Sequence, residues 1–410
     1  MNGKLKKNVL YLTALQFFNY AAPLILVPYL IFLLGTEKYG LIAVILGITQ
    51  FCYVITEFGF AQSSTAKIAE NVNDKENVAL INGAVIIIKI ILSLICAIMS
   101  ALFILYQGYG GGILLLGVML IILSQALQPI WFFNGIEDMG KITAFTLLSK
   151  SLYFILSVIG LLFLKDINIV IYSMAISTTV GTALSYILLY RTGYNILLPG
   201  ITILVEEFRF ARQFFWARGA VSLYTSLCTI IVGAAGGIQS AALFSVCEQI
   251  YKAGKALTAP LCQALYPYLI RTKDWKVFFK FFTITSLVMF LGCIFVMLIS
   301  KFILNTIFHV DARESVTTLK ILSITVFISF LGVYFGHLAL VPLNKIKVAN
   351  NSVLVGAFFF VIVNLVLYQF NLISPISMAG VIFLTELIIT LIRVIAFYIA
   401  YQAEKNKCQM

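Results

Sequence analysis

The chain carries very little charge, and this scarcity excludes the soluble classes of protein. Only 11% of its 410 residues are Asp, Glu, Lys or Arg, whereas a soluble domain usually has about a quarter. No stretch is polar enough to form a separate soluble domain, so the surplus of Lys and Arg is no argument for nucleic acid as a partner. Because 61% of the residues are hydrophobic and the mean hydropathy is +1.04, we predict an all-α, polytopic membrane protein.

Motifs for metal, cofactor and redox chemistry are also lacking. The seven cysteines form no CxxC pair, and six of them lie in apolar segments, as small buried hydrophobic residues do. The two histidines, His309 and His337, do not have the spacing of metal ligands. Gly254-Lys255 lacks the upstream glycine and the following hydroxyl residue of a phosphate-binding loop. We therefore expect no metal, no cofactor and no enzymatic activity.

Long apolar segments are abundant, and about 20 such residues cross the hydrocarbon core as a helix. Twelve candidates cover residues 8–34, 40–60, 78–106, 112–133, 142–164, 168–190, 211–235, 238–262, 277–300, 316–341, 349–371 and 376–400. The seventh and eighth are the most polar. Seventeen Lys and Arg residues fall on the side of the N-terminus and five on the other side, so both termini are expected to be cytoplasmic.

The longest connection divides the twelve segments into two groups of six. The predicted domains are an N-terminal six-helix bundle (1–190), a cytoplasmic linker (191–210) and a C-terminal six-helix bundle (211–410). The halves resemble each other weakly, since "LGTEKYGLIAV" aligns with "GGIQSAALFSV" through Gly35 and Gly237, and Lys141 aligns with Lys347 at a similar offset. We predict two pseudo-symmetric bundles related by an axis along the membrane normal, with substrate bound between them.

Ionisable side chains inside the predicted spans are functional candidates, because each costs about 2.5–3.5 kcal/mol near the bilayer centre. The cations predicted to line a central cavity and bind substrate are Lys89, Lys150, Arg218, Lys252, Lys255 and Arg393. The carboxylates predicted as coupling groups or charge partners are Glu57, Glu248 and Glu386. Their surplus of positive charge predicts a water-filled cationic cavity for an anionic substrate. The alternatives are ion pairs, along one helix as for Glu248 and Lys252 or between helices, and snorkelling of Glu57 and Arg393.

Two segments carry a family resemblance: "EFGFAQSSTAKIAE", from Glu57 to Glu70, and "PIWFFNGIEDMGKIT", from Pro129 to Thr143. Both resemble characteristic segments of the Wzx O-antigen flippases, in the polysaccharide transporter family. That family belongs to the MOP superfamily, with the MATE exporters and the lipid II flippases. The length, the twelve spans and the two halves extend the resemblance over essentially the whole chain. The second segment has a purely structural alternative, a tight loop and gate between helices that does not contact substrate.

The resemblance implies a flippase of the bacterial inner membrane. It would move an undecaprenyl-diphosphate-linked oligosaccharide from the cytoplasmic to the periplasmic leaflet by alternating access. It also implies a polysaccharide polymerase and a chain-length regulator as partners, and H⁺ or Na⁺ as a coupling ion. Lys and Arg side chains suit the diphosphate, and Trp216 and Tyr224 are candidates for stacking on sugars or, equally, for packing. The rival hypotheses are a cation-coupled drug exporter and a membrane polysaccharide polymerase or ligase.

Overall fold

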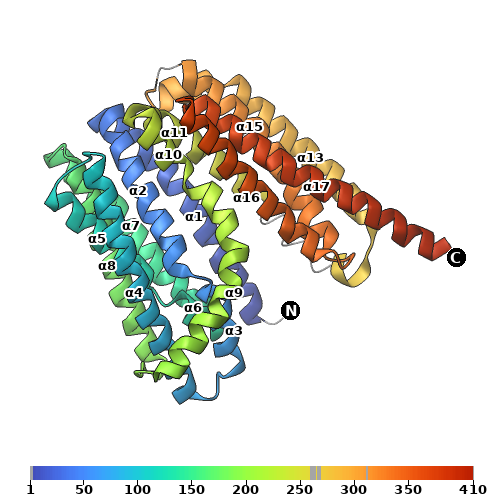
Figure 1. Ribbon diagram of the computed structural model, residues 1–410, viewed down its shortest axis with the longest axis horizontal. Coiled ribbons are helices and arrows are strands. Elements are labelled where there is room, and N and C mark those ends of the chain that lie inside the picture. The colour runs from blue at the N-terminus through green and yellow to red at the C-terminus, as the bar shows by residue number, and fades with distance from the viewer. Residues whose placement is uncertain (1–2, 259–264, 266–268, 311–312, 410) are drawn as a thin grey trace. The chain divides into compact units, whose positions relative to one another are not determined.

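The computed structural model describes residues 3–258, 265, 269–310 and 313–409, and their side chains except those of 3–15, 17, 216–224, 337 and 405–409. The described part of the chain is helical and contains no β-strand. It divides into two compact units, Met1–Ile230 and Ile231–Met410, here called the N-terminal and C-terminal units. Figure 1 shows the helices of both units, coloured along the chain.

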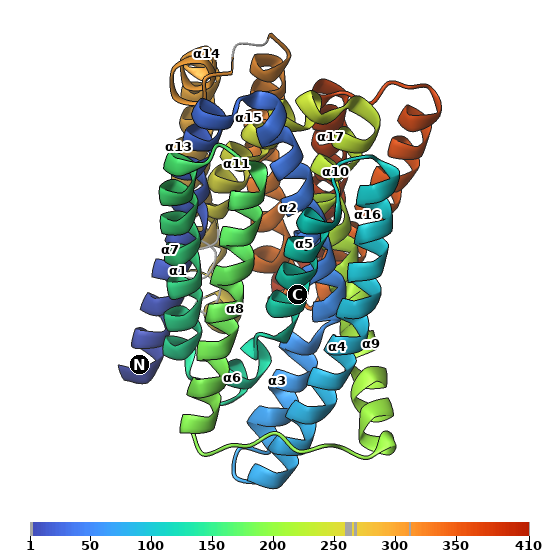
Figure 2. The same cartoon turned by 90° about the vertical axis from the view of Figure 1, so that its left-hand side faces the viewer.

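The N-terminal unit is built from long helices with two short ones between them. They are α1 (Gly3–Leu34), α2 (Thr36–Glu57), α3 (Phe60–Glu70), α4 (Lys75–Tyr106), α5 (Gly112–Leu127), α6 (Ile130–Gly135), α7 (Met139–Phe163), α8 (Ile167–Arg191) and α9 (Ile201–Ser226). Helices α3 and α6 pack on each other, at the end of the unit where α1 begins (Figure 2).

The C-terminal unit follows a short helix, α10 (Cys228–Gly236), that spans the boundary between the units. Its elements are α11 (Ile238–Ala256), α13 (Trp275–Leu298), α14 (Ser300–Phe302), the π-helix η1 (Ile303–Ile307), α15 (Arg313–Val333), the π-helix η2 (Tyr334–Leu338), α16 (Ile346–Gln369) and α17 (Pro375–Gln409). Helix α15 packs along α17, α11 and α13, and α16 packs along α17.

Each of the twelve predicted spans overlaps at least one helix in the described part of the chain, and the spans 40–60 and 211–235 each cover parts of two helices. Among the described residues, nine helices are long and apolar enough to cross a membrane, and the apolar part of α1, Phe18–Leu34, is a shorter one. Helices α9 and α11 do not belong to this set. They contain residues of the seventh and eighth predicted spans, which are the most polar by hydropathy. Three of the helices begin with an aspartate that accepts backbone N–H groups of the first turn: Asp74, Asp166 and Asp274. The chain is therefore a helical, multi-pass membrane protein.

The two positions paired by the predicted repeat have the same local structure. Gly35 precedes α2 with φ 83° and ψ 165°, and Gly237 precedes α11 with φ 90° and ψ 161°. Only glycine adopts this conformation without strain. A second match precedes α7 and α16, where Glu137 and Asn344 have φ of 57° and 58°. In both turns this residue donates its N–H three residues back, and the next residue donates five residues back.

The predicted linker is partly packed against the N-terminal unit. The N–H of Leu197 donates to the carbonyl of Ala79 in α4 at 3.1 Å. A Cβ on Gly83 would lie 1.8 Å from the carbonyl oxygen of Leu197, so a glycine is required where this non-helical segment approaches α4. Helix α9 continues the contact with α2, α3 and α4, and the compact unit therefore extends to residue 230. The division into 1–190 and 211–410 stays a prediction.

Candidate functional site

The segment "EFGF" breaks a membrane helix and places a carboxylate at the break. Phe58 and Gly59 have φ of 44° and 86°, so the chain turns through the left-handed region between α2 and α3. Glu57 is the last residue of α2. One of its oxygens accepts the N–H of Ala61 at 2.7 Å, which caps the first turn of α3, and the other lies 2.7 Å from Nζ of Lys89 in α4.

Lys89 is buried and contacts both segments that carry the family resemblance. Its side chain is 1% exposed, and its Nζ lies 4.5 Å from the ring centroid of Trp131 in α6 and 5.9 Å from that of Phe60 in α3. Trp131 donates its indole N–H to Oδ1 of Asn82 in α4 at 3.1 Å. A buried ammonium needs such partners to offset its loss of hydration, and through them Lys89 connects α4 with α2, α3 and α6.

A second ion pair ties α3 to α9. Nζ of Lys67 lies 2.6 Å from Oε1 of Glu207, and the hydroxyl of Ser64 donates to Oε2 at 3.4 Å. The ring of Phe210 covers Lys67 at 5.1 Å. Sequence reasoning missed Glu207, because it lies in the stretch predicted as a linker and its partner is far away along the chain.

The short helix α6 acts as a packing element in this cluster. Thr65 in α3 donates its hydroxyl to the carbonyl of Trp131 at 3.0 Å. A Cβ on Gly135 would lie 2.6 Å from Cγ2 of Ile68, closer than real Cβ contacts. These contacts favour the interpretation of "PIWFFNGIEDMGKIT" as a tight connection between helices.

Three charged residues of α11, Glu248, Lys252 and Lys255, take part in two ion pairs within the C-terminal unit. Lys252 pairs with Glu248 one turn earlier at 3.1 Å, while Lys255 reaches Oε1 of Glu386 in α17 at 2.5 Å. The hydroxyl of Tyr251 lies 3.4 Å from both Lys255 and Glu386. The carboxylates are buried, and the side chains of Lys252 and Lys255 remain 37% and 27% exposed. This pair of lysines therefore has surface left for a ligand.

Arg393 lies inside the C-terminal unit, 7% exposed, so it does not snorkel. Its guanidinium donates to the hydroxyl of Ser352 at 2.9 Å and to the carbonyls of Gly332 and Ala349 at 2.8 and 3.0 Å. Those groups belong to α15 and α16, on either side of η2. The backbone of Gly336 in η2 is not helical, and a Cβ there would lie 2.9 Å from the guanidinium.

The other predicted cations and aromatic residues are Lys150, Trp216, Arg218 and Tyr224. Lys150 in α7 is half-buried and donates to the amide oxygen of Asn19 in α1. Trp216, Arg218 and Tyr224 lie in α9, outside the part of the chain whose side chains are described. Among the described residues no group of His, Cys, Asp and Glu side chains could hold a metal ion.

The structure therefore distributes the predicted charges in a way that the sequence did not reveal. All three predicted carboxylates are paired, Glu57 with Lys89, Glu248 with Lys252, and Glu386 with Lys255. The sequence indicated no local partner for Lys89, because Glu57 is on another helix. An ion pair between helices, which was the alternative to a cavity-lining role, is present at Lys89 and at Lys255.

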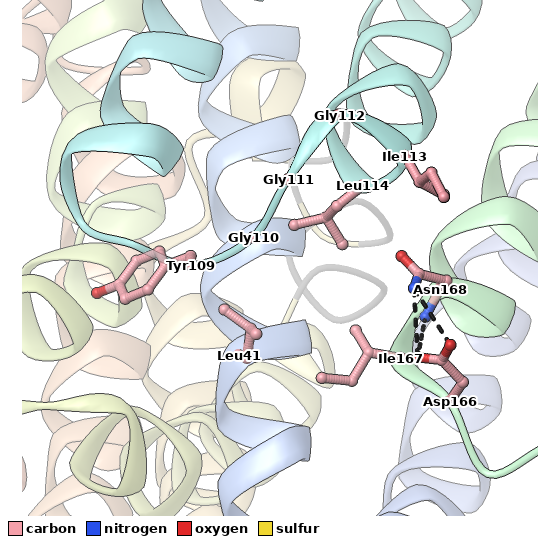
Figure 3. A pocket seen from close by; sticks show the side chains of 10 residues that line it. All are labelled: Leu41, Tyr109, Gly110, Gly111, Gly112, Ile113, Leu114, Asp166, Ile167 and Asn168. Atoms are coloured by element: carbon pink, nitrogen blue, oxygen red, sulfur yellow. Dashed lines mark hydrogen bonds between the residues drawn. The ribbon is translucent and has the colours of Figure 1, made fainter.

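A shallow pocket of about 330 Å³ lies in the N-terminal unit, at the end away from α3 and α6. It is lined by Leu41, the turn between α4 and α5, and the start of α8 (Figure 3). Its carboxylate, Asp166, is already occupied: both oxygens accept hydrogen bonds from Asn168. Its polar groups therefore serve the start of α8, and we assign no ligand to it.

Comparison with known proteins places this architecture in a class. The lipid II flippase MurJ in an inward closed conformation has a TM-score of 0.73 with 13% identity over 95% of this chain and 87% of that one. A multidrug resistance MATE family transporter of the MOP superfamily, in an inward-facing conformation, has a TM-score of 0.69 with 15% identity over 98% of this chain and 99% of that one. The fold is thus that of the MOP superfamily, as predicted.

The family is defined more narrowly by sequence. Residues 5–273 match the family described as "Polysaccharide biosynthesis protein", and the chain belongs to that family. A protein of Escherichia coli (strain K12) named "Putative O-antigen transporter" is 28% identical over 279 residues, which are 65% of this chain. The match also spans 65% of that relative's length, just under two thirds.

Proposed function

We propose that this protein carries a lipid-linked oligosaccharide across the bacterial inner membrane. The lipid carrier would be undecaprenyl diphosphate, and the sugar unit would pass from the cytoplasmic to the periplasmic leaflet by alternating access, with both termini in the cytoplasm. The observation that carries the proposal is the match of residues 5–273 to a polysaccharide biosynthesis family. The fold shared with a lipid II flippase and the name of the E. coli relative support it. A polymerase and a chain-length regulator would use the delivered product.

The lysines of α11 are the groups that suit the diphosphate. Lys252 and Lys255 are one turn apart, partly exposed, and each is held in place by a buried carboxylate. Protonation of Glu386 or Glu248 would release its lysine to bind phosphate oxygens, so these carboxylates are our candidates for coupling transport to H⁺.

The remaining predicted cations differ in how well they suit contact with substrate. Lys150 has an amide oxygen as its partner and stays a candidate for substrate contact, as does Arg218. The enclosure of Lys89 and Arg393 by protein groups favours a role in holding helix breaks. Their predicted role in substrate binding, with that of Glu57 in coupling and of Trp216 and Tyr224 in stacking, stays a prediction, as does the cavity between the two halves.

The decisive experiment measures delivery of a fluorescent undecaprenyl-diphosphate oligosaccharide across proteoliposomes, read as accessibility to a membrane-impermeant quencher. We expect transport by the wild type, and a rate reduced by roughly tenfold in Lys255→Gln/Glu386→Gln, as when about 1.4 kcal/mol of ligand binding is lost. The double substitution removes both charges and leaves no buried carboxylate unpaired. Lys273→Gln, in an exposed ion pair with Glu404, is the matched control and should transport normally.

The same vesicles separate the rival functions. A wild type that leaves the glycolipid in place but extrudes a cationic dye would refute the flippase and identify a drug exporter. Lengthening of the oligosaccharide during the assay would identify a polymerase. The shared fold with a MATE transporter makes the dye the necessary comparison.

A further inference from the structure

The C-terminal unit contains an apolar groove that the charged residues do not account for. It has a volume of about 300 Å³ and lies between α11, α13 and α15. Tyr251, Gly254 and Leu257 line it from α11, with Val288 and Gly292 from α13 and others from α15. This volume is at the lower end of the range of about 300–1,000 Å³ for ligand pockets.

Two glycines create the groove. Gly254 lets α11 approach α15, since a Cβ there would already lie 3.2 Å from Val326. Gly292 has no atom within 4 Å of its Cβ position, so the absent side chain leaves space within the groove. Apolar cavities do not retain water and accept hydrocarbon instead. A hydrocarbon chain is therefore the chemically matched occupant.

The groove opens towards lipid. Leu257, Val288 and Phe295 at its edge are 63%, 64% and 61% exposed, although they are apolar. Helix α13 has the smallest buried share of the nine candidate spans among the described residues, as expected of a helix whose outer face contacts hydrocarbon. A chain can thus enter sideways from the bilayer without leaving an apolar environment.

Tyr251 gives the groove a polar edge. It lines the groove, and its hydroxyl lies 3.4 Å from Nζ of Lys255, one turn further along α11. Lys255 does not itself line the groove, and its side chain is 27% exposed. A ligand with a hydrocarbon chain in the groove would therefore place its head group near Lys255, which favours an anionic head.

We propose that the α11–α13–α15 groove binds the isoprenoid chain of the lipid-linked substrate and so positions its diphosphate near Lys255. The inference rests on the proposed function and extends it with a site for the lipid. A membrane phospholipid has an apolar chain and an anionic head as well, and the test distinguishes the two sources.

The probe is undecaprenyl diphosphate with a photoactivatable benzophenone in its isoprenoid chain, added to the full-length protein in phosphatidylcholine nanodiscs. We expect crosslinks in the peptides around 250–257 and 288–296. Gly292→Phe fills the groove, and labelling there should fall by roughly tenfold, equivalent to about 1.4 kcal/mol of binding. Leu291→Phe adds a similar ring on the same helix at a position that is 55% exposed and does not line the groove, so its labelling should not change.

Three results would overturn the proposal: wild-type crosslinks elsewhere, equal labelling of Gly292→Phe, and displacement of the probe by an equal amount of phosphatidylglycerol. The last would identify a general phospholipid site. The crosslink positions in the wild type decide the matter even if Gly292→Phe does not fold. Glycolipid transport is measured in parallel. Transport by Gly292→Phe at the wild-type rate would refute the role of the groove but not the flippase function. Absence of transport by the wild type would refute the flippase function itself.

Discussion

Both units bury a cation beside an irregular segment of a membrane helix, but they stabilise it in different ways. In the N-terminal unit the helix breaks at Phe58 and Gly59, and the break supplies a carboxylate, Glu57, for Lys89. In the C-terminal unit the helix widens into a π-helix, and backbone carbonyls near it receive the guanidinium of Arg393. An ammonium is a point charge, which suits a single anion, whereas the planar guanidinium satisfies several oxygens at once.

The difference teaches that buried charge is not in itself evidence for a substrate site. Removing one partner of a buried ion pair costs about 3–5 kcal/mol, so such pairs strongly constrain the helices that carry them. The lysines of α11 differ from Lys89 and Arg393 because part of each side chain remains exposed. Partial exposure beside a buried counter-ion is the property on which the proposed binding role of Lys252 and Lys255 rests.

The largest expected effect is at Lys89. Lys89→Met leaves the carboxylate of Glu57 without its ammonium, and we expect a loss of about 3–5 kcal/mol in stability. Lys89→Met/Glu57→Gln removes both charges, retains an oxygen for the N–H of Ala61, and should recover most of the loss. Thermal unfolding of detergent-solubilised protein measures both. A double variant as unstable as the single one would show that the charge pairing is not what stabilises Lys89.

A smaller loss is expected at Arg393, and it tests the other half of the comparison. Arg393→Lys keeps the charge but cannot reach the three oxygens together, and each unsatisfied buried group costs about 1–3 kcal/mol. Hydrogen exchange of the segment 330–350, read by mass spectrometry, should become faster. The exposed Lys273→Arg is the control. Unchanged exchange in Arg393→Lys would mean that the positive charge alone stabilises η2, without the three hydrogen bonds of the guanidinium.

Glycine substitutions sharpen the comparison at the level of packing. Gly135→Ala places a methyl group 2.6 Å from Ile68, and overpacking of this kind costs about 1–3 kcal/mol. Gly380→Ala, within α17 and with no atom within 4 Å of the new Cβ, should be neutral or stabilising by about 0.5–1 kcal/mol. The melting temperatures of both variants are compared with that of the wild type. Equal shifts in the two variants would contradict the packing role of α6.

The smallest effect concerns pH at the start of α8. The backbone N–H and side-chain amide of Asn168 hold the pKa of Asp166 below its usual range. A carboxyl with a depressed folded pKa stabilises the fold above its unfolded pKa, and this contribution disappears as pH falls through the folded value. Because Asp166 is exposed, the contribution is small. Asp166→Asn should make unfolding near the α7–α8 turn less dependent on pH below about 4, as measured by hydrogen exchange, with Asp74→Asn for comparison.

Much of the fold follows from local patterns. Runs of apolar residues predict the helices, because a backbone in hydrocarbon must satisfy its own hydrogen bonds. The matching glycines, Gly35 and Gly237, were found by alignment and have matching backbone conformations. The relatively polar character of α9 and α11 is likewise visible in their composition. The family resemblance of two short segments, confirmed by the match of residues 5–273, indicated the superfamily fold.

The candidate site could be predicted only in part. The choice of ionisable residues inside the spans needed no coordinates, since their cost in a bilayer makes them conspicuous. Their partners could not be chosen, because Lys255 lies on the same helix as Glu248, two turns away, and yet pairs with Glu386 on α17. Glu207 was missed for the same reason, since it lies far along the chain from Lys67, with which it pairs.

Composition and local hydropathy establish that this protein spans the membrane, that it is helical, and where its charges interrupt the apolar helices. These properties depend on the transfer of each residue from water to hydrocarbon, which is a local quantity. The packing of the helices sets which charges neutralise each other, which lysines keep exposed surface, and where two glycines leave an apolar groove. Those outcomes depend on distances between helices that are far apart in the chain, and a few ångströms decide whether a charge is paired or available.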